Sequence, residues 1–172
     1  MISIPHAGNF YPKTFLKNKS ISLNDLKGMQ DFKCDKVIEK INKNLVDIVI
    51  AHCSRAVVDL NRSREAIDED MFADKFLTKP VSDILMIKSG LGVIPKKFNN
   101  IEIFDDKIPF HYDENLLKKY YDPYHNFLKL NIEKIRKIFG CVILLDIHSM
   151  PSNIKNSNGE KIDIIIGDNF GK

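Results

Sequence analysis

The sequence has only three cysteines, Cys34, Cys53 and Cys141, and no two of them form a Cys-x-x-Cys pair. This scarcity excludes a disulfide framework and a zinc site built from cysteine thiolates. No apolar run approaches the roughly 18 residues that a membrane-spanning helix needs. No signal peptide precedes the first strand-like segment. We therefore expect a cytoplasmic protein without a membrane partner.

An excess of charge of one sign is also absent, because the formal net charge is only +3. No run of lysine and arginine is interleaved with aromatic residues on one face, so we expect no nucleic-acid partner. The hydrophobic fraction of 44% and the charged fraction of 28% are ordinary for a globular protein. Internal repeats and low-complexity linkers are lacking too, which predicts a single domain over residues 1–172.

Strand-like and helix-like segments alternate along the chain, which predicts an α/β fold with a mostly parallel sheet. Residues 63–112 form a long irregular stretch with three prolines, of the kind that often encloses a substrate. Two nearly continuous apolar runs, 141–149 and 162–168, have the pattern of strands buried in a parallel sheet. The other expected strands are 2–5, 45–51 and 56–60. Two helices are expected, over 31–44 and 113–139. Asp31 would cap the first helix, and Pro123 would kink or split the second.

Two histidines, His6 and His148, come directly at the ends of predicted strands. Ligands of open parallel sheets bind outside the carboxyl ends of the strands, so both side chains point to the same edge. A catalytic zinc ion takes three protein ligands from histidine and carboxylate and keeps one position open. Asp31 is the best third ligand, although it could equally be a simple helix cap, and Asp25 and Asp35 are weaker alternatives.

Two arginines bracket a short apolar segment, Arg55 to Arg62, which ends in Asp59, Asn61 and Arg62. Arginine can grip a carboxylate with two parallel hydrogen bonds, and an asparagine beside it adds a neutral donor. A surface salt bridge is the alternative interpretation of either arginine. The Asp-Leu-Asn-Arg run after an apolar segment favours a carboxylate site.

Four motifs in this order, PHAG, SRAVVDLNR, DPYH and LDIHS, are similar to the motif series of the N-formylglutamate amidohydrolase family. The resemblance covers nearly the whole chain, from Ile2 to Gly171. Two of the motifs are also similar to segments of zinc carboxypeptidases and of acylases such as aspartoacylase. The resemblance implies a three-layer αβα fold of the zinc-exopeptidase (phosphorylase/hydrolase-like) type and a bound zinc ion.

Carried over position by position, His6 and His148 resemble zinc ligands, and Asn61 and Arg62 resemble the clamp for the substrate carboxylate. Arg55 and His125 match residues of the substrate pocket. Asp31 matches the second acidic position of an Asp-x-Asp-aromatic segment and is supported, by analogy, by cell-wall zinc amidases. The first acidic position of that segment is Met29 here. The implied reaction is hydrolysis of N-formyl-L-glutamate, or a close N-acyl amino acid, to formate and L-glutamate in histidine degradation.

Members of the family continue beyond the position that matches Lys172, with a Gly-rich loop and a strand that carries a glutamate. In related hydrolases this glutamate is the general base. We therefore expect a chain that is incomplete at its C-terminus, that lacks the catalytic base, and that could associate through exposed apolar surface. Two alternatives remain: an impaired, truncated remnant that binds metal, and another zinc hydrolase such as a cell-wall amidase or a carboxypeptidase.

Overall fold

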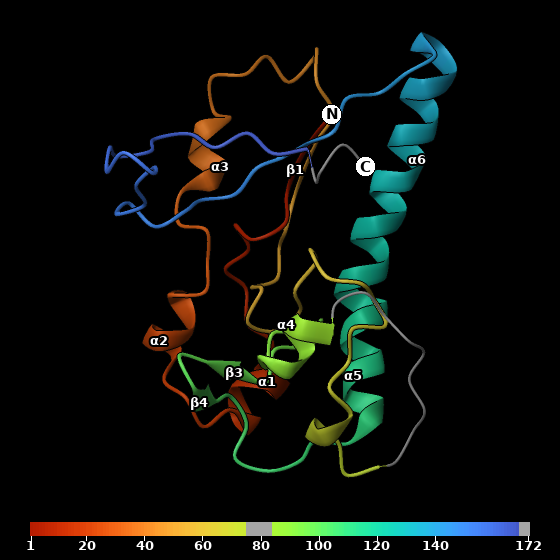
Figure 1. Ribbon diagram of the computed structural model, residues 1–172. Coiled ribbons are helices and arrows are strands. Elements are labelled where there is room, and N and C mark those ends of the chain that lie inside the picture. The colour runs from red at the N-terminus through yellow and green to blue at the C-terminus, as the bar shows by residue number, and fades with distance from the viewer. Residues whose placement is uncertain (75–83, 169–172) are drawn as a thin grey trace.

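The computed structural model describes residues 1–74 and 84–168 (Figure 1). Its helices and strands are short except at one place, the long helix α6. In chain order they are β1 (Ile2–Ile4), α1 (Lys13–Asn18), α2 (Leu23–Lys27), α3 (Cys34–Val37), β2 (Ile48–Ile50), a 3-10 turn (Glu69–Met71), α4 (Ile84–Lys88), β3 (Lys97–Phe98), β4 (Ile101–Glu102), α5 (Phe110–Leu116), a π-helical turn (Leu117–Tyr121), α6 (Asp122–Phe139) and β5 (Leu145–Asp146).

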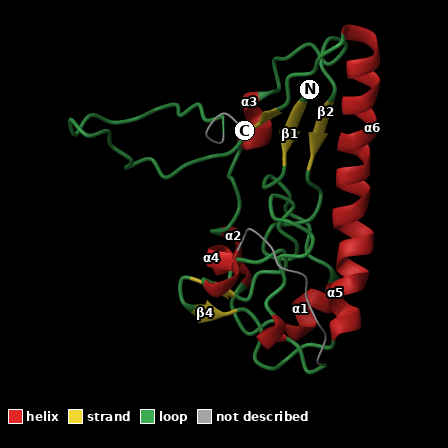
Figure 2. Cartoon of the chain, turned by 45° about the vertical axis from the view of Figure 1, so that its right-hand side comes forward, coloured by secondary structure: helices red, strands yellow, loops and turns green. Residues whose placement is uncertain are grey.

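A three-stranded parallel sheet in the order β2-β1-β5 organises one end of the molecule, with β1 at its centre. Alternate residues of β1 face opposite sides of the sheet. Ile2 and Ile4 pack with Cys34 and Ile38 at α3, whereas the Ser3 hydroxyl lies 2.8 Å from the Tyr124 hydroxyl of α6. Helices α3 and α6 thus lie on opposite sides of the sheet (Figure 2). The fold is mixed α/β with a mostly parallel sheet, as predicted.

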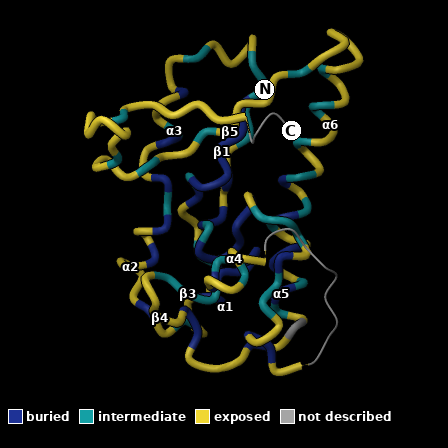
Figure 3. Tube along the Cα trace, in the orientation of Figure 1, coloured by how far each residue is buried: buried dark blue, intermediate teal, exposed yellow. Residues whose placement is uncertain are grey.

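A larger hydrophobic core lies beyond the carboxyl ends of the strands, where buried segments gather (Figure 3). Residues 63–112 contribute to it directly, because Val93, Ile94 and Ile103 are almost fully buried. The described part of this stretch is irregular, as predicted, with only short helices and strands, but it packs into the core rather than lying loosely over it. Residues 75–83 lie outside the description, and a role of the stretch in enclosing a substrate stays a prediction. The fully or almost fully buried apolar side chains of this core include Phe15, Leu26, Val57, Val58, Val93, Ile94, Ile103 and Leu117.

The helix predicted over 31–44 is reduced to the four residues of α3. Lys33 precedes it with φ of 60°, a left-handed conformation that an α-helix does not contain. The helix therefore cannot begin at Asp31, and Asp31 is not its N-cap. Only part of the expected apolar face is buried, because Phe32 and Val37 are exposed.

The helix predicted over 113–139 begins earlier, at Phe110, and is divided as expected near Pro123. The division takes the form of a π-helical turn in which the Asp122 N–H donates to the Leu117 carbonyl. Proline has no N–H to continue an α-helical ladder, so a local change of helix type relieves the missing bond. Within the described residues, no helix combines the length and the apolar character required to cross a membrane.

Four strand predictions were wrong in extent or in kind. Residues 56–60 are buried but form turns rather than a strand, because the Val57 and Val58 N–H groups both bond back to the Ser54 carbonyl. The strand predicted over 141–149 is limited to β5, which pairs only with β1 among the described residues and is exposed rather than buried. Residues 162–168 form no strand, and Ile164, Ile165 and Ile166 are exposed. The strand predicted over 45–51 is shorter, as β2.

Candidate metal centre

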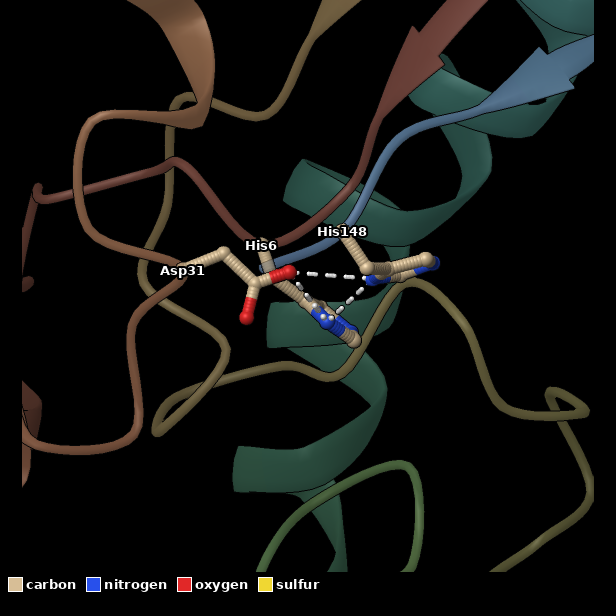
Figure 4. A group of neighbouring side chains, drawn as sticks. All are labelled: His6, Asp31 and His148. Carbon is tan, nitrogen blue, oxygen red and sulfur yellow. Dashed lines mark hydrogen bonds and ion pairs between the residues drawn. The ribbon is translucent and has the colours of Figure 1, made fainter. Parts of the chain in front are cut away.

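Three side chains converge just beyond the carboxyl end of the central strand: those of His6, Asp31 and His148 (Figure 4). The Nδ1 atoms of the two histidines lie 3.1 Å apart. The Asp31 Oδ2 atom lies 3.0 Å from the Nδ1 of His148 and 3.5 Å from the Nδ1 of His6. The structure thus brings together the three residues predicted as metal ligands.

Backbone pairing explains why residues so far apart in sequence meet. Strands β1 and β5 are parallel neighbours, so His6 and His148, which follow them, leave the sheet at the same edge. The Asp31 N–H donates to the His6 carbonyl at 3.1 Å, which ties the third segment to the first. Asp25, one of the two alternatives to Asp31, lies elsewhere and bonds to Ser22 at the start of α2.

The Nε2 atom of each histidine is hydrogen-bonded to an aspartate other than Asp31. The Nε2 of His6 lies 2.7 Å from the Oδ1 of Asp59, and the Nε2 of His148 lies 3.0 Å from the Oδ2 of Asp146. An ionised carboxylate only accepts hydrogen bonds, so both Nε2 atoms carry a proton. Both Nδ1 atoms are therefore the ones that point toward Asp31. Histidine ligands of metals are commonly oriented by a carboxylate in this way.

Burial and hydrogen bonds between these side chains shift the pKa values of Asp31, Asp59 and His148. Burial opposes ionisation of Asp31, but hydrogen bonds from His148 and His6 outweigh it and hold its pKa well below the usual range. Burial also opposes ionisation of Asp59, yet the hydrogen bond from His6 lowers its pKa to about 2. Hydrogen bonds to Asp146 and Asp31 raise the pKa of His148 to about 9. A proton on His148 thus occupies the place where a cation would bind, and metal uptake would displace it.

The donor set and its spacing fit a zinc ion. In a tetrahedral site with bonds of about 2.0–2.1 Å, ligand atoms stand roughly 3.3 Å apart. The three separations in this triad are 3.0, 3.1 and 3.5 Å. Two imidazole nitrogens and one carboxylate oxygen are ligands that catalytic zinc accepts, with a fourth position left for water or substrate.

The residues predicted to bind substrate differ in what they contact, and Asn61 contacts the triad directly. The Asn61 Nδ2 atom lies 3.3 Å from the Nε2 of His148. Arg62 donates to the carbonyls of Leu91 and Asn61, and no described carboxylate lies within ion-pair distance of it. Its charge therefore remains available for an anion.

The other two predicted pocket residues have partners within the protein. Arg55 donates to the Oδ2 of Asp59 at 2.8 Å and forms an ion pair with it, while its buried Nε has no partner among the described residues. The Nε2 of His125 lies 2.9 Å from the Leu60 carbonyl. Both contacts act on the Asp59–Arg62 segment, so these side chains organise that segment in the structure.

A cleft of about 740 Å³ opens beside the triad. Asp31 and Arg55 line it, together with Leu91, whose carbonyl accepts the bond from Arg62. A second cleft, of about 500 Å³, lies between the sheet and α6 and is lined by Asn61, His125 and Asp146. The triad is thus accessible from a cavity large enough for an amino-acid derivative.

The sequence reasoning did not select Asp59 or Asp146 as site residues. Both lie inside the recognised motifs, and Asp146 precedes His148 by two residues, the spacing that places two side chains on one face of an extended strand. The Asp-x-His pattern at a strand end was therefore the available signal for Asp146. Asp59 stands in the Asp-Leu-Asn-Arg run, but its contact with His6, which is 53 residues away, has no signal in the sequence.

The sequence profile described as N-formylglutamate amidohydrolase matches residues 1–172. The chain belongs to the N-formylglutamate amidohydrolase family. It also resembles the crystal structure of N-formylglutamate amidohydrolase from Ralstonia eutropha JMP134, with a TM-score of 0.77 and 27% sequence identity. The likeness covers 88% of this chain and 54% of that one, so the chain spans about half the length of this family member. No curated protein sequence matches the chain.

Replacing Asp59 with asparagine is expected to weaken zinc binding by about 10- to 100-fold, the usual effect of removing the carboxylate that orients a histidine ligand. An asparagine keeps the size of the side chain but offers His6 a weaker acceptor. Affinity is measured by competition with a chromophoric chelator. Asp68→Asn is the matched control, because Asp68 pairs with Lys96 rather than with a triad residue. Equal zinc affinities in the two variants would contradict the assigned role of Asp59.

Proposed function

We propose that this chain carries the zinc site and part of the substrate pocket of an enzyme that hydrolyses N-formyl-L-glutamate to formate and L-glutamate. The proposal includes a three-layer, zinc-exopeptidase-like arrangement around the parallel sheet, supported by α3 and α6 on its two sides. His6, Asp31 and His148 are the proposed zinc ligands, and Asn61 and Arg62 the proposed clamp for a substrate carboxylate.

One observation carries the proposal: both histidines direct Nδ1 at the same carboxylate oxygen while an aspartate holds each Nε2. A structural histidine needs one partner, and this paired arrangement prepares two lone pairs for one cation. When bound there, zinc would polarise an amide carbonyl and lower the pKa of water to about 7.

The residues of the chain supply binding and orientation in this scheme. Arg62 and Asn61 would hold a carboxylate of the substrate, which fixes the amide that meets the ligand triad. Asp59 and Asp146 keep the histidines in one tautomer. We assign the general base to no residue of this chain. The family match favours this reaction over a cell-wall amidase or a carboxypeptidase.

The test is release of formate from N-formyl-L-glutamate by the zinc-loaded chain, with His148→Ala as the inactive variant. His111→Ala is the matched control, because His111 is exposed on α5 and is not one of the three clustered residues. Because no general base is assigned, we expect slow formate release by the wild type and by His111→Ala, and none by His148→Ala. Zinc binding without turnover would support the alternative of a chain that retains the metal site but lacks the base, and turnover in His148→Ala would contradict the site.

A further inference from the structure

The segment that bears Asn61 and Arg62 has no regular secondary structure of its own, so something else must fix it. Its first part is held by Asp59, whose Oδ1 accepts the Asn61 N–H at 2.9 Å. Its carbonyls at Leu60 and Arg62 accept no backbone N–H among the described residues. A loop with free carbonyls would leave the two clamp side chains able to shift.

Two side chains of the long helix bind those carbonyls, one on each side of Asn61. The Tyr121 hydroxyl donates to the Arg62 carbonyl at 2.8 Å. The Nε2 of His125 lies 2.9 Å from the Leu60 carbonyl. A carbonyl only accepts, so His125 must carry its proton on Nε2. Burial lowers the pKa of His125, which favours this neutral form.

The Tyr121 and His125 side chains also pack against each other. Tyr121 and His125 are four residues apart, which places them on one face of a helix. Their rings stack with centroids 4.1 Å apart and an angle of 30° between the planes. Tyr121 is the last residue of the π-helical turn and His125 belongs to the first turn after Pro123. The helix irregularity imposed by Pro123 thus lies at the point where the helix meets the loop, a common place for π-helical turns.

We propose that Tyr121 and His125 are positioning residues, which hold the carbonyls on both sides of Asn61 and so set where the Asn61 amide and the Arg62 guanidinium receive a carboxylate. The inference rests on the proposed function of Asn61 and Arg62. It gives His125 a role different from the direct substrate contact that the family resemblance implies. Tyr121, by the same reasoning, joins the site although no motif pointed to it.

The test removes one hydrogen bond at a time from the zinc-loaded chain. Tyr121→Phe keeps the ring stack and loses only the hydroxyl, and His125→Leu loses the donor. His125→Gln offers an amide N–H that can reach the Leu60 carbonyl and is the conservative rescue variant. Tyr120→Phe removes the neighbouring hydroxyl and is the matched control. Binding of N-formyl-L-glutamate is measured by calorimetry, together with zinc affinity and the NMR signals of the Asn61 side-chain amide and the Arg62 Nε–H.

We expect Tyr121→Phe and His125→Leu to weaken N-formyl-L-glutamate binding by roughly 5- to 10-fold, the effect of one hydrogen bond. Zinc affinity should stay within about twofold, and the signals of Asn61 and Arg62 should shift even without ligand. His125→Gln should restore most of the affinity, and Tyr120→Phe should match the wild type. Where turnover is measurable, KM should rise while kcat changes little.

The outcomes separate this inference from the function on which it rests. A zinc-loaded wild type that binds no N-formyl-L-glutamate would contradict the proposed function and the inference with it. A wild type that binds, beside a Tyr121→Phe variant that binds equally well, would overturn the positioning role alone. A parallel loss of zinc affinity would also overturn it, because the effect would then come from general disruption of the site.

Discussion

Asp31→Asn is expected to lower zinc affinity by more than about 100-fold. This exceeds the loss typical when a residue that only hydrogen-bonds to a metal ligand is replaced. The Oδ2 of Asp31 faces both Nδ1 atoms, and an amide oxygen in its place lacks the negative charge that the cation requires. Asparagine has nearly the same shape, so the loss should come from the charge rather than from packing. Zinc affinity is measured by chelator competition at pH 7.5.

Asp35→Asn is the matched control for Asp31→Asn. It makes the same change of net charge four residues along the chain, in α3, and Asp35 was one of the two alternative ligands considered from the sequence. We expect the zinc affinity of Asp35→Asn to equal that of the wild type. If Asp35→Asn weakened binding while Asp31→Asn did not, the assigned ligand would be wrong.

Asp113→Asn is expected to stabilise the protein at pH 8 and to flatten its dependence on pH. Asp113 is fully buried, and neither of its carboxylate oxygens has a hydrogen-bond partner in the described structure. Burial raises its pKa from 3.8 to about 7, against a weaker opposite effect of Arg64. A shift of one pKa unit corresponds to about 1.36 kcal/mol, so ionising Asp113 in the folded state costs about 4 kcal/mol.

The direction of the pH effect follows from the raised pKa. The folded state holds a proton that the unfolded state releases, so stability is highest below the unfolded pKa near 4. It falls as the pH rises toward the folded pKa of about 7 and is then constant. Between pH 5 and pH 8 the wild type should lose about 3 kcal/mol relative to Asp113→Asn.

Urea unfolding at pH 5 and pH 8 measures this difference. Asp122→Asn is the control, because the hydrogen bond from Arg64 lowers the pKa of Asp122, which places its own effect at acidic pH. Parallel pH profiles of the wild type and Asp113→Asn would show that Asp113 does not keep its proton in the folded state.

The sequence predicted the parts of the site that local patterns carry. His6 and His148 could be placed together because parallel strands end at one edge, and β1 and β5 do pair in parallel. Asp31 was selected as the start of a helix and lies beside the histidines for another reason, its backbone bond to the His6 carbonyl. Whether these three residues bind zinc stays a prediction until the metal is measured.

Regular elements were harder to predict than the site. Apolar runs such as 56–60 look like strands, but burial alone does not decide between a strand and a buried turn. The run 141–149 was expected to lie between neighbours, and only β1 pairs with it in the described residues. Lys33 adopts a left-handed backbone conformation, and His125 contacts the Leu60 carbonyl. Both features depend on tertiary packing, so no sequence pattern predicts them.

The two histidines of the triad are 142 residues apart. Joining such distant segments costs chain entropy, and contacts of this kind generally slow folding. A cation held by both would therefore cross-link the first and the last parts of the fold and stabilise the folded state by mass action. The capture of zinc during refolding should then report the moment at which β5 docks on β1.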